Sequence, residues 1–326
     1  MAGEEDQMLK IEASRLTAAT ALSRRHFLLG TAGVAGAAML PRRLWAQATP
    51  HAFQHGEFEI MVVSDGHLVL PIGILAPDAP PEELAALIEA AGIGPDEFMP
   101  PTNPVLIRSG SEVILFDTGS GGEFQPETSG RLAENLSATG IAAESITKVV
   151  FTHAHPDHVY GTVMEAGLRY PNAVHYVAAA EWDFWMDPDL KSKMPEDMHA
   201  FVDGAQKHLS GVEDKLTMLN PGDDVVTGIR VLDTAGHTPG HISFEIAGDE
   251  GLILVGDAIA EPAVFFPHPD WRFGFDGIPD LAIEKRRALL DRAATDRVKM
   301  IGFHWPYPGV AYAERKNGGY VYAPAA

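Results

Sequence analysis

The sequence predicts a single domain of mixed α and β structure. Short runs of β-branched and other apolar residues recur along the whole 326-residue chain, and stretches with helical spacing of apolar residues lie between them. Both halves of the chain contain both patterns, with β-rich segments on either side of the helical ones. Beyond residue 56 the sequence has no internal repeat, low-complexity block or linker. Periodicity alone therefore indicates the class, α/β or α+β, and not the arrangement.

The elements can be assigned in chain order from periodicity and turn residues. Residues 57–70 read as two β runs around Asp65-Gly66, which we interpret as a hairpin turn. Pro81 opens a helix whose residues 84, 87, 88 and 91 form one apolar face. The remaining expected elements are strands 104–108 and 112–116, a helix with Leu132 and Leu136 that ends at Gly140, strands 146–151 and 173–177, a mainly helical stretch 179–210, strands 215–219, 229–232, 242–246 and 252–255, a helix 279–292, and strands 298–302, 309–312 and 319–322.

The N-terminus predicts export. Residues 23–29, Ser-Arg-Arg-His-Phe-Leu-Leu, resemble a twin-arginine signal, and a Gly/Ala-rich apolar run follows up to Leu40. This run is shorter than the about 20 residues that span a bilayer, and Ala46-Gln47-Ala48 offers a cleavage site. We expect residues 1–48 to be a signal peptide that the twin-arginine machinery reads and that is then removed. Residues 49–326 would form one periplasmic or secreted domain without a stable membrane anchor.

Composition narrows the functional classes. The chain has no cysteine, so neither a disulfide nor a thiolate ligand or nucleophile is available. Its net charge is −21, and residues 49–326 alone carry −23 because the first 48 residues hold six basic and four acidic side chains. Such a surface repels phosphate backbones, so we expect no nucleic-acid partner. The Gly-rich segment 119–122 matches neither a nucleophile elbow nor a phosphate loop, and we interpret it as a flexible turn at the rim of a pocket.

The most informative motif is Thr152-His153-Ala-His155-Pro-Asp157-His158, which follows the expected strand 146–151. Two imidazoles one residue apart at a strand end can point the same way and bind one metal. Asp157 and the histidine that follows it, His158, can face a second metal beside the first. Imidazole and carboxylate ligands together suit zinc and its first-row neighbours. The motif therefore predicts a metal site.

Further candidate ligands follow other expected strands downstream. His237 lies in Thr-Ala-Gly-His-Thr-Pro-Gly-His, Asp257 follows Leu-Ile-Leu-Val-Gly, and His304 follows Met-Ile-Gly-Phe. A strand end is a rigid place from which to present a ligand. His241, four residues after His237, is interpreted instead as a histidine that packs behind the ligands.

The order of these motifs resembles the two-metal branch of the metallo-β-lactamase superfamily over roughly residues 56–323. The resemblance implies an αββα sandwich, with two mixed sheets face to face and helices outside. By motif, His153, His155 and His237 would bind one metal, whereas Asp157, His158 and His304 would bind a second, with Asp257 bridging them. Asp117 would lie behind the ligands and orient an imidazole, or simply cap the Asp-Thr-Gly turn.

Within the superfamily the sequence is similar to the methyl parathion hydrolase group and its lactonase-like relatives. Shared motifs include Ser64-Asp65-Gly66-His67, the paired runs 104–110 and 113–119, and His304 followed by Pro308-Gly309. By local motif that group's aromatic pocket maps to Phe124, Trp185 and Phe201. The aromatic and Pro-rich region 261–275 would line the pocket or bury a dimer contact, so a homodimer is left open.

These observations predict a dinuclear hydrolase. Two divalent metals, zinc first with manganese, cobalt or iron as alternatives, would share an activated hydroxide, with Asp157 and Asp257 as catalytic carboxylates. The expected substrate is a small neutral ester: a lactone, an aryl ester or an organophosphate triester. Two other interpretations stay open, a mononuclear-iron enzyme that oxidises a persulfide and a metal-binding protein without catalysis.

Overall fold

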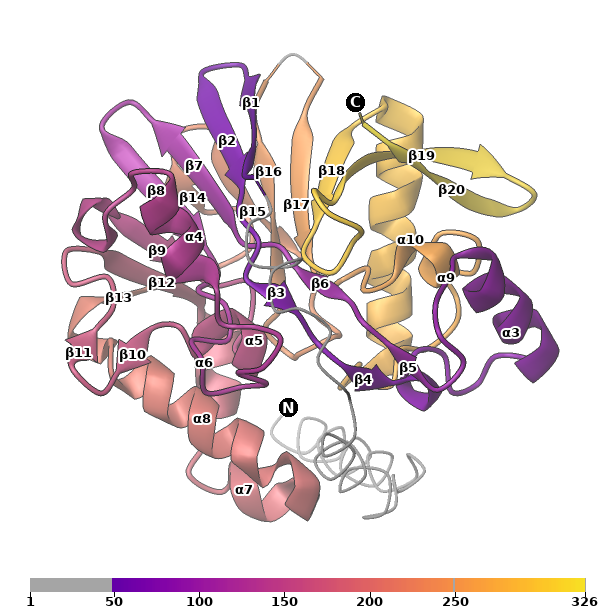
Figure 1. Ribbon diagram of the computed structural model, residues 1–326, viewed down its shortest axis with the longest axis horizontal. Helices are drawn as coiled ribbons and strands as arrows, with labels where there is room; N and C mark the ends of the chain where they lie inside the picture. Colours follow the sequence, from indigo (N-terminus) through magenta and orange to yellow (C-terminus); the bar gives the residue numbers. More distant parts are fainter. Residues whose placement is uncertain (1–48, 249, 326) are drawn as a thin grey trace, which may run out of the picture.

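The computed structural model describes residues 49–248 and 250–325. The predicted signal peptide, residues 1–48, lies outside the described residues. Two seven-stranded sheets lie face to face, and helices cover the outer face of each (Figure 1). Within the described ranges, no helix has the length and apolar character that crossing a membrane requires.

The first sheet comes mainly from the N-terminal half and is mixed. Its four leading strands pair antiparallel, and the pairs β8–β9, β9–β12 and β12–β13 are parallel. In spatial order the strands are β1 (His51–His55), β2 (Phe58–Val62), β7 (Val105–Ser109), β8 (Glu112–Phe116), β9 (Lys148–Val150), β12 (Val174–Ala178) and β13 (Leu216–Leu219).

The second sheet comes from the C-terminal half and is also mixed. Its neighbouring strands pair antiparallel except β17 and β18, which are parallel. In spatial order the strands are β14 (Asp224–Val226), β15 (Ile229–Asp233), β16 (Ile242–Ile246), β17 (Leu252–Gly256), β18 (Lys299–Gly302), β19 (Val310–Lys316) and β20 (Gly319–Pro324).

Three short strand pairs lie outside the two sheets: β3 (Gly66–His67) with β6 (Pro101–Thr102), β4 (Leu70–Pro71) with β5 (Glu97–Phe98), and β10 (Val163–Met164) with β11 (Gly167–Leu168). The helices that accompany the first sheet are α4 (Leu132–Ala138), α5 (Pro156–Val159), α6 (Ala179–Trp185), α7 (Leu190–Lys193) and α8 (His199–Ser210). Those that accompany the second sheet are α3 (Pro81–Ala90), α9 (Pro262–Phe265) and α10 (Pro279–Asp296).

The period-two alternation of side chains along the strands builds three apolar layers. In β8, Leu115 faces the helices of the first sheet, whereas Ile114 and Phe116 face the second sheet. In β17, Leu254 lies in the layer between the sheets and Ile253 lies under the helices of the second sheet. Because both faces of these strands are buried, their sequences are almost wholly apolar, with Glu112 at the half-exposed start of β8 as the exception. The predicted αββα sandwich with two mixed sheets is confirmed.

Two local predictions differ from the structure. Asp65-Gly66 is not a hairpin turn, because the hairpin turns earlier, between His55 and Phe58. Asp65 is instead buried, and its carboxylate accepts the backbone N–H groups of Ser120, Gly130 and Leu132. Most of the segment 119–122 is also packed, since Ser120 is fully buried and a Cβ at Gly121 would lie 2.2 Å from the carbonyl oxygen of Tyr160, whereas Gly122 is exposed.

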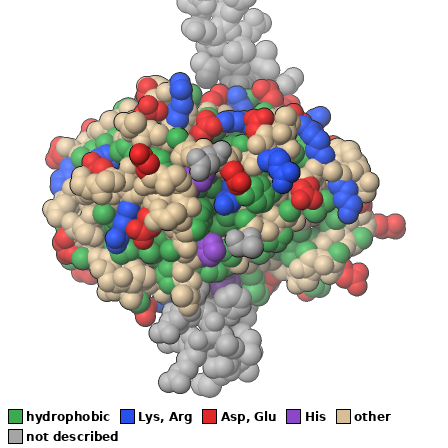
Figure 2. All heavy atoms as spheres, turned by 90° about the horizontal axis from the view of Figure 1, so that it is seen from above, with side chains coloured by type: hydrophobic (Ala, Val, Ile, Leu, Met, Phe, Trp, Pro, Cys, Tyr) green, Lys and Arg blue, Asp and Glu red, His purple; other side chains and the backbone are tan. Residues whose placement is uncertain are grey.

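Charged side chains of both signs are interspersed over the face drawn in Figure 2, around a central band of hydrophobic side chains.

Candidate metal centre

The seven predicted ligands lie together at one edge of the sandwich, and all are buried. They are His153, His155, Asp157, His158, His237, Asp257 and His304. Each follows the end of a strand: the first four follow β9, and the others follow β15, β17 and β18 in turn. Strands β15, β17 and β18 run in the same direction, so their C-terminal ends meet at one edge. The sheet topology therefore brings together residues up to 151 positions apart in the sequence.

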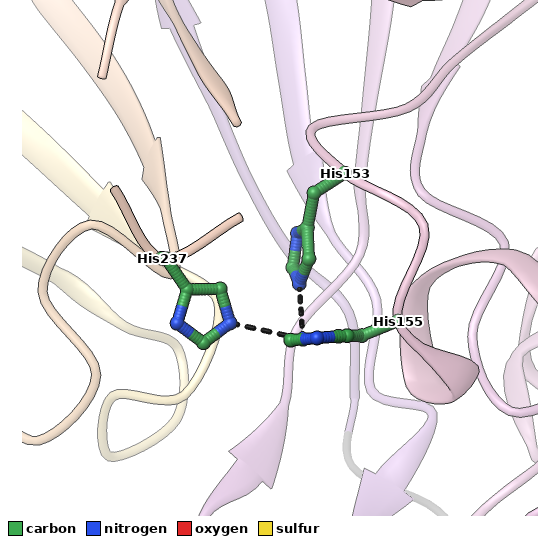
Figure 3. Close-up of side chains that lie close together, drawn as sticks. All are labelled: His153, His155 and His237. Carbon is green, nitrogen blue, oxygen red and sulfur yellow. Dashed lines mark hydrogen bonds between the residues drawn. The ribbon is translucent and has the colours of Figure 1, made fainter. Parts of the chain in front are cut away.

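Three imidazoles form the first half of the site, where His153, His155 and His237 point toward one another (Figure 3). Nδ1 of His155 lies 3.0 Å from Nε2 of His153 and 3.0 Å from Nε2 of His237. An imidazole nitrogen carries one hydrogen or one in-plane lone pair, so Nδ1 cannot satisfy both neighbours by hydrogen bonding. A cation among the three nitrogens would satisfy them all.

Asp157, His158 and His304 form the second half of the site. Oδ2 of Asp157 lies 3.4 Å from Nε2 of His158 and 3.3 Å from Nε2 of His304. Nε2 of His158 and Oδ2 of Asp157 are buried without a hydrogen-bond partner among the described residues. Buried polar atoms without partners are costly, and a bound ion is one of the few explanations for them.

Asp257 lies between the two halves. Its Oδ2 is 3.4 Å from Nε2 of His237 and 3.2 Å from Nε2 of His304. Its Oδ1 is 3.3 Å from Nε2 of His158 and otherwise has no hydrogen-bond partner in the described structure. One carboxylate thus faces both groups of imidazoles, which is the position that a bridging ligand requires. The donor set fits two divalent metal ions.

The outward-facing ring nitrogens of the histidines are held by acceptors. Nδ1 of His158 donates to Oδ2 of Asp117 at 2.9 Å, and Nδ1 of His304 donates to the carbonyl oxygen of Pro101 at 2.9 Å. Nδ1 of His153 lies 3.0 Å from the hydroxyl of Thr152, which itself donates to Asp117. Such contacts fix the tautomer, so that the inner Nε2 keeps its lone pair for a metal.

Asp117 lies where the sequence placed it, behind the ligands. It follows β8 and has a φ of 61°, a left-handed conformation that is uncommon for residues other than glycine. Its Oδ1 also accepts the backbone N–H of Thr152 at 2.8 Å. The carboxylate therefore joins the turn after β8 to the ligand loop after β9.

Burial and charge divide the site into a neutral and a charged half. Burial lowers the pKa of His153 and of His155 well below the usual range, which keeps both rings neutral, as metal ligation requires. Burial also opposes a charge on His304, but the carboxylates of Asp257 and Asp157 outweigh it and raise the pKa of His304 to about 10. The acidic half of the site therefore attracts positive charge.

His241 supports the backbone at Asp257 from behind the clustered residues. Nε2 of His241 accepts the backbone N–H of Asp257 at 3.0 Å, and its Nδ1 lies 2.8 Å from the hydroxyl of Thr234. Burial lowers the pKa of His241 to about 3, so the ring is neutral, and it belongs to none of the ligand groups found among the described residues. This agrees with its interpretation as a packed histidine.

An apolar pocket opens directly above the ligands. Besides His155, Asp157, His237, Asp257 and His304, its lining consists of Leu68, Leu70, Phe98, Pro100, Phe124, Phe201, Ala260, Phe273 and Phe275. Phe124 and Phe201 thus lie where the sequence placed them. Trp185 does not line the pocket, because its fully buried indole packs edge-on behind His155, with ring centroids 5.8 Å apart, and donates to Glu181. Of the region 261–275, Phe273 and Phe275 form part of the pocket wall.

The model of the metallo-beta-lactamase superfamily matches residues 99–304, a range that contains all seven clustered residues. The chain belongs to this superfamily. The hydrolase AbOPH, described as a member of the beta lactamase superfamily, is 27% identical, with a TM-score of 0.80, and the match covers 86% of this chain and 98% of that one. AidC, a dizinc quorum-quenching lactonase, is 28% identical, with a TM-score of 0.79 and coverage of 85% and 97%.

Two curated relatives match over shorter segments. The uncharacterized protein YobT of Bacillus subtilis is 25% identical over 48% of this chain, and the N-acyl homoserine lactonase AttM of Agrobacterium fabrum is 29% identical over 38% of it. The matches span 62% and 46% of the lengths of these two relatives.

Three buried charged residues near the site were not predicted: Glu181, Asp276 and Arg286. Glu181 follows the end of β12, just as the clustered residues follow the ends of their strands. The sequence does not show that β12 runs parallel to β9 and so ends at the same edge of the sheet. Asp276 and Arg286 lie in a loop and in α10, with no motif around them.

Proposed function

We propose that the protein is a metal-dependent hydrolase of neutral, apolar esters, with a lactone or carboxyl ester as the usual substrate and a phosphotriester as a secondary one. The observation that carries the proposal is the apolar pocket whose floor is formed by five of the seven clustered residues. A substrate held in this pocket would place its polar ester group against the ligands.

The pocket selects for neutral substrates. Among the described lining residues, the polar side chains all belong to the metal centre, and the rest are Leu, Pro, Ala and Phe. No lysine or arginine in this lining offsets an anionic substrate. Apolar acyl or aryl groups would gain free energy from leaving water.

The chain's own residues then have defined tasks. When bound, two divalent metals would supply a water whose pKa is lowered toward neutrality and would polarise the carbonyl or phosphoryl group. His153, His155 and His237 would hold one metal, Asp157, His158 and His304 the other, and Asp257 would contact both. The carboxylates of Asp157 and Asp257 also face the pocket, where each can accept a hydrogen bond from the attacking water and so orient it.

Zinc is the metal that we propose, because neutral imidazoles with carboxylates suit it and no soft thiolate is present in the chain. AidC is named as a dizinc lactonase and AttM as a lactonase. The name of AidC supports the choice of zinc, and both names support a lactone as the substrate class proposed for this chain. We further propose export of the protein to the periplasm or beyond through the segment 23–48.

The proposal is tested by parallel rate measurements on the purified, zinc-loaded protein. The panel comprises an acyl-homoserine lactone, an aryl acetate and a dimethyl phosphotriester with a nitrophenol leaving group. Turnover that a chelator abolishes and added zinc restores is the expected result, with the lactone or aryl ester ahead of the phosphotriester. Absence of turnover on all three substrates in protein that holds two metals per chain would contradict the proposed activity.

A further inference from the structure

A buried ion pair lies directly behind His237. Nδ1 of His237 donates to Oδ1 of Asp276 at 3.2 Å, and Oδ2 of Asp276 accepts from Nη2 of Arg286 at 2.8 Å. Both charged side chains of the pair are fully excluded from solvent. The three side chains therefore form a continuous hydrogen-bonded chain from the metal centre to helix α10.

Arg286 uses its remaining donors on the loop that leads from Asp257 to Asp276. Its Nε donates to the carbonyl oxygen of Ala258 at 3.1 Å, and Nη1 donates to that of Trp271 at 2.7 Å. The guanidinium also lies 4.3 Å from the centre of the Phe265 ring, a cation–π distance. One side chain on a rigid helix thus fixes both ends of this loop.

Burial of two charges is costly, so the pair is weak evidence for stability by itself. Its geometry suits another role. Asp276 accepts the outer N–H of His237, which selects the tautomer whose Nε2 lone pair faces His155, and a carboxylate in this place makes an imidazole a stronger metal ligand. Arg286 compensates the charge of Asp276 and holds it in place by a planar donor group.

The same loop carries part of the pocket wall. Ala260, Phe273 and Phe275 line the pocket, and the backbone N–H of Phe273 approaches Oδ2 of Asp276 at 3.3 Å. The ring of Phe273 also stacks on His237, with centroids 5.9 Å apart. Asp276, whose carboxylate orients His237, is thus connected to the aromatic wall that the substrate would contact.

We propose that Asp276 and Arg286 are positioning residues that set the metal affinity of the three-histidine half of the site and hold the pocket wall in register with it. The inference rests on the proposed metal centre, but not on the identity of the substrate.

The test uses the full chain, freed of metal and titrated with cobalt(II), whose visible absorption reports the ligand environment. The variants are Asp276→Asn, which places an amide N–H₂ where an acceptor is needed, and Arg286→Lys, which keeps the charge but loses the planar fork. Matched controls on the exposed side of the same helix are Asp280→Asn and Arg287→Lys. Thermal unfolding of the metal-free proteins is measured in parallel.

We expect Asp276→Asn to weaken the binding of one of the two cobalt ions by about 10- to 100-fold, with a changed spectrum and the other ion retained, because outer partners of ligating histidines have effects of this size. Arg286→Lys should shift the same ion in the same direction by less, and the controls should match the wild type. The expected kinetic signature is a loss in kcat with zinc at limiting concentration that excess zinc partly restores.

Two cobalt ions bound by both variants with wild-type affinity and spectrum, even alongside lowered thermal stability, would overturn the proposal and leave a purely structural pair. If Asp276→Asn does not fold, Asp276→Glu and Arg286→Lys carry the same comparison, and wild-type cobalt binding in both would again overturn it. A wild-type protein that binds no cobalt would instead contradict the proposed metal centre itself.

Discussion

Glu181 offers a sharp test because one buried carboxylate joins the two ligand loops. Its Oε1 accepts the backbone N–H of Ala154 at 2.8 Å and the indole N–H of Trp185 at 2.6 Å. Its Oε2 accepts the hydroxyl of Thr238 at 2.6 Å and the backbone N–H of Gly240 at 3.0 Å. Ala154 lies between His153 and His155, and Thr238 follows His237, so Glu181 connects the three candidate ligands of the same half-site.

The perturbation is Glu181→Gln, which keeps the shape and replaces one oxygen with an N–H₂ group. Burial raises the pKa of Glu181, and its four hydrogen-bond donors act against this rise. Three of these donors are N–H groups, which can only donate, so each needs an acceptor at this position. In the variant, two donors face the new N–H₂ group and lose their acceptor. A hydrogen bond to a charged group contributes about 1.5–3 kcal/mol, so the loss of two should lower the free energy of unfolding by about 3–6 kcal/mol.

The assay is urea and thermal unfolding of the metal-free full chain, with Asp183→Asn, an exposed position on the same helix, as the control. A loss in this range corresponds to a fall in Tm of about 5–10 °C for a protein of this size, and the control should stay within about 0.5 kcal/mol of the wild type. Gly240→Ala should be at least as damaging, because its Cβ would lie 2.0 Å from the backbone nitrogen of Glu181. A Glu181→Gln protein within about 1 kcal/mol of the wild type would refute this reasoning.

Three further predictions follow from the same geometry. Asp257→Ala should lose one metal per chain and at least about 100-fold in kcat, and full turnover by a one-metal variant would show that Asp257 is not needed. Burial lowers the pKa of His175 to about 4 from the usual 6.5, so the unfolded chain takes up this proton first and stability is lost as pH falls from 6.5 toward 4. His175→Phe should therefore remove about 3 kcal/mol of this pH dependence in chelator-treated protein, and an unchanged pH profile would contradict it. Phe275→Ala should lower kcat/KM for an aryl ester about tenfold with metal content intact, whereas equal losses for methyl and aryl esters would argue against contact between the wall and the aryl group.

Strand ends explain why so much of the site could be predicted. The residues from His153 to His158 stand in one contiguous motif, and Asp257 and His304 each follow an apolar run that the sequence shows plainly. Phe124 and Phe201 lie in the pocket as expected, and the sheets follow the predicted strands closely. Information that is local in the chain was therefore sufficient for the fold class and for the candidate residues, whereas their grouping around two metals was implied by the resemblance to the metallo-β-lactamase superfamily.

The missed features depend on long-range packing. Asp65 was interpreted as a turn residue because Asp-Gly favours turns, but it lies at the ligand edge of the first sheet, where it accepts three N–H groups. Trp185 has the residue type of a pocket wall, yet its indole faces the carboxylate of Glu181. The contact between Asp276 and His237 spans 39 positions in the sequence, and Asp276 is held in turn by the buried Arg286 of helix α10. No local spacing signals such contacts.

The metal content of the protein tests the proposed centre most directly. Full-length wild type, His304→Ala and His199→Ala would each be saturated with zinc, freed of excess and analysed for metal and protein. The arrangement of the two half-sites predicts two zinc ions per chain in the wild type and in the His199 control, and one in His304→Ala. His199 belongs to none of the candidate ligand groups found among the described residues. A wild type with a single ion, or with one iron that excludes zinc, or a His304→Ala protein that still holds two ions, would contradict the dinuclear centre.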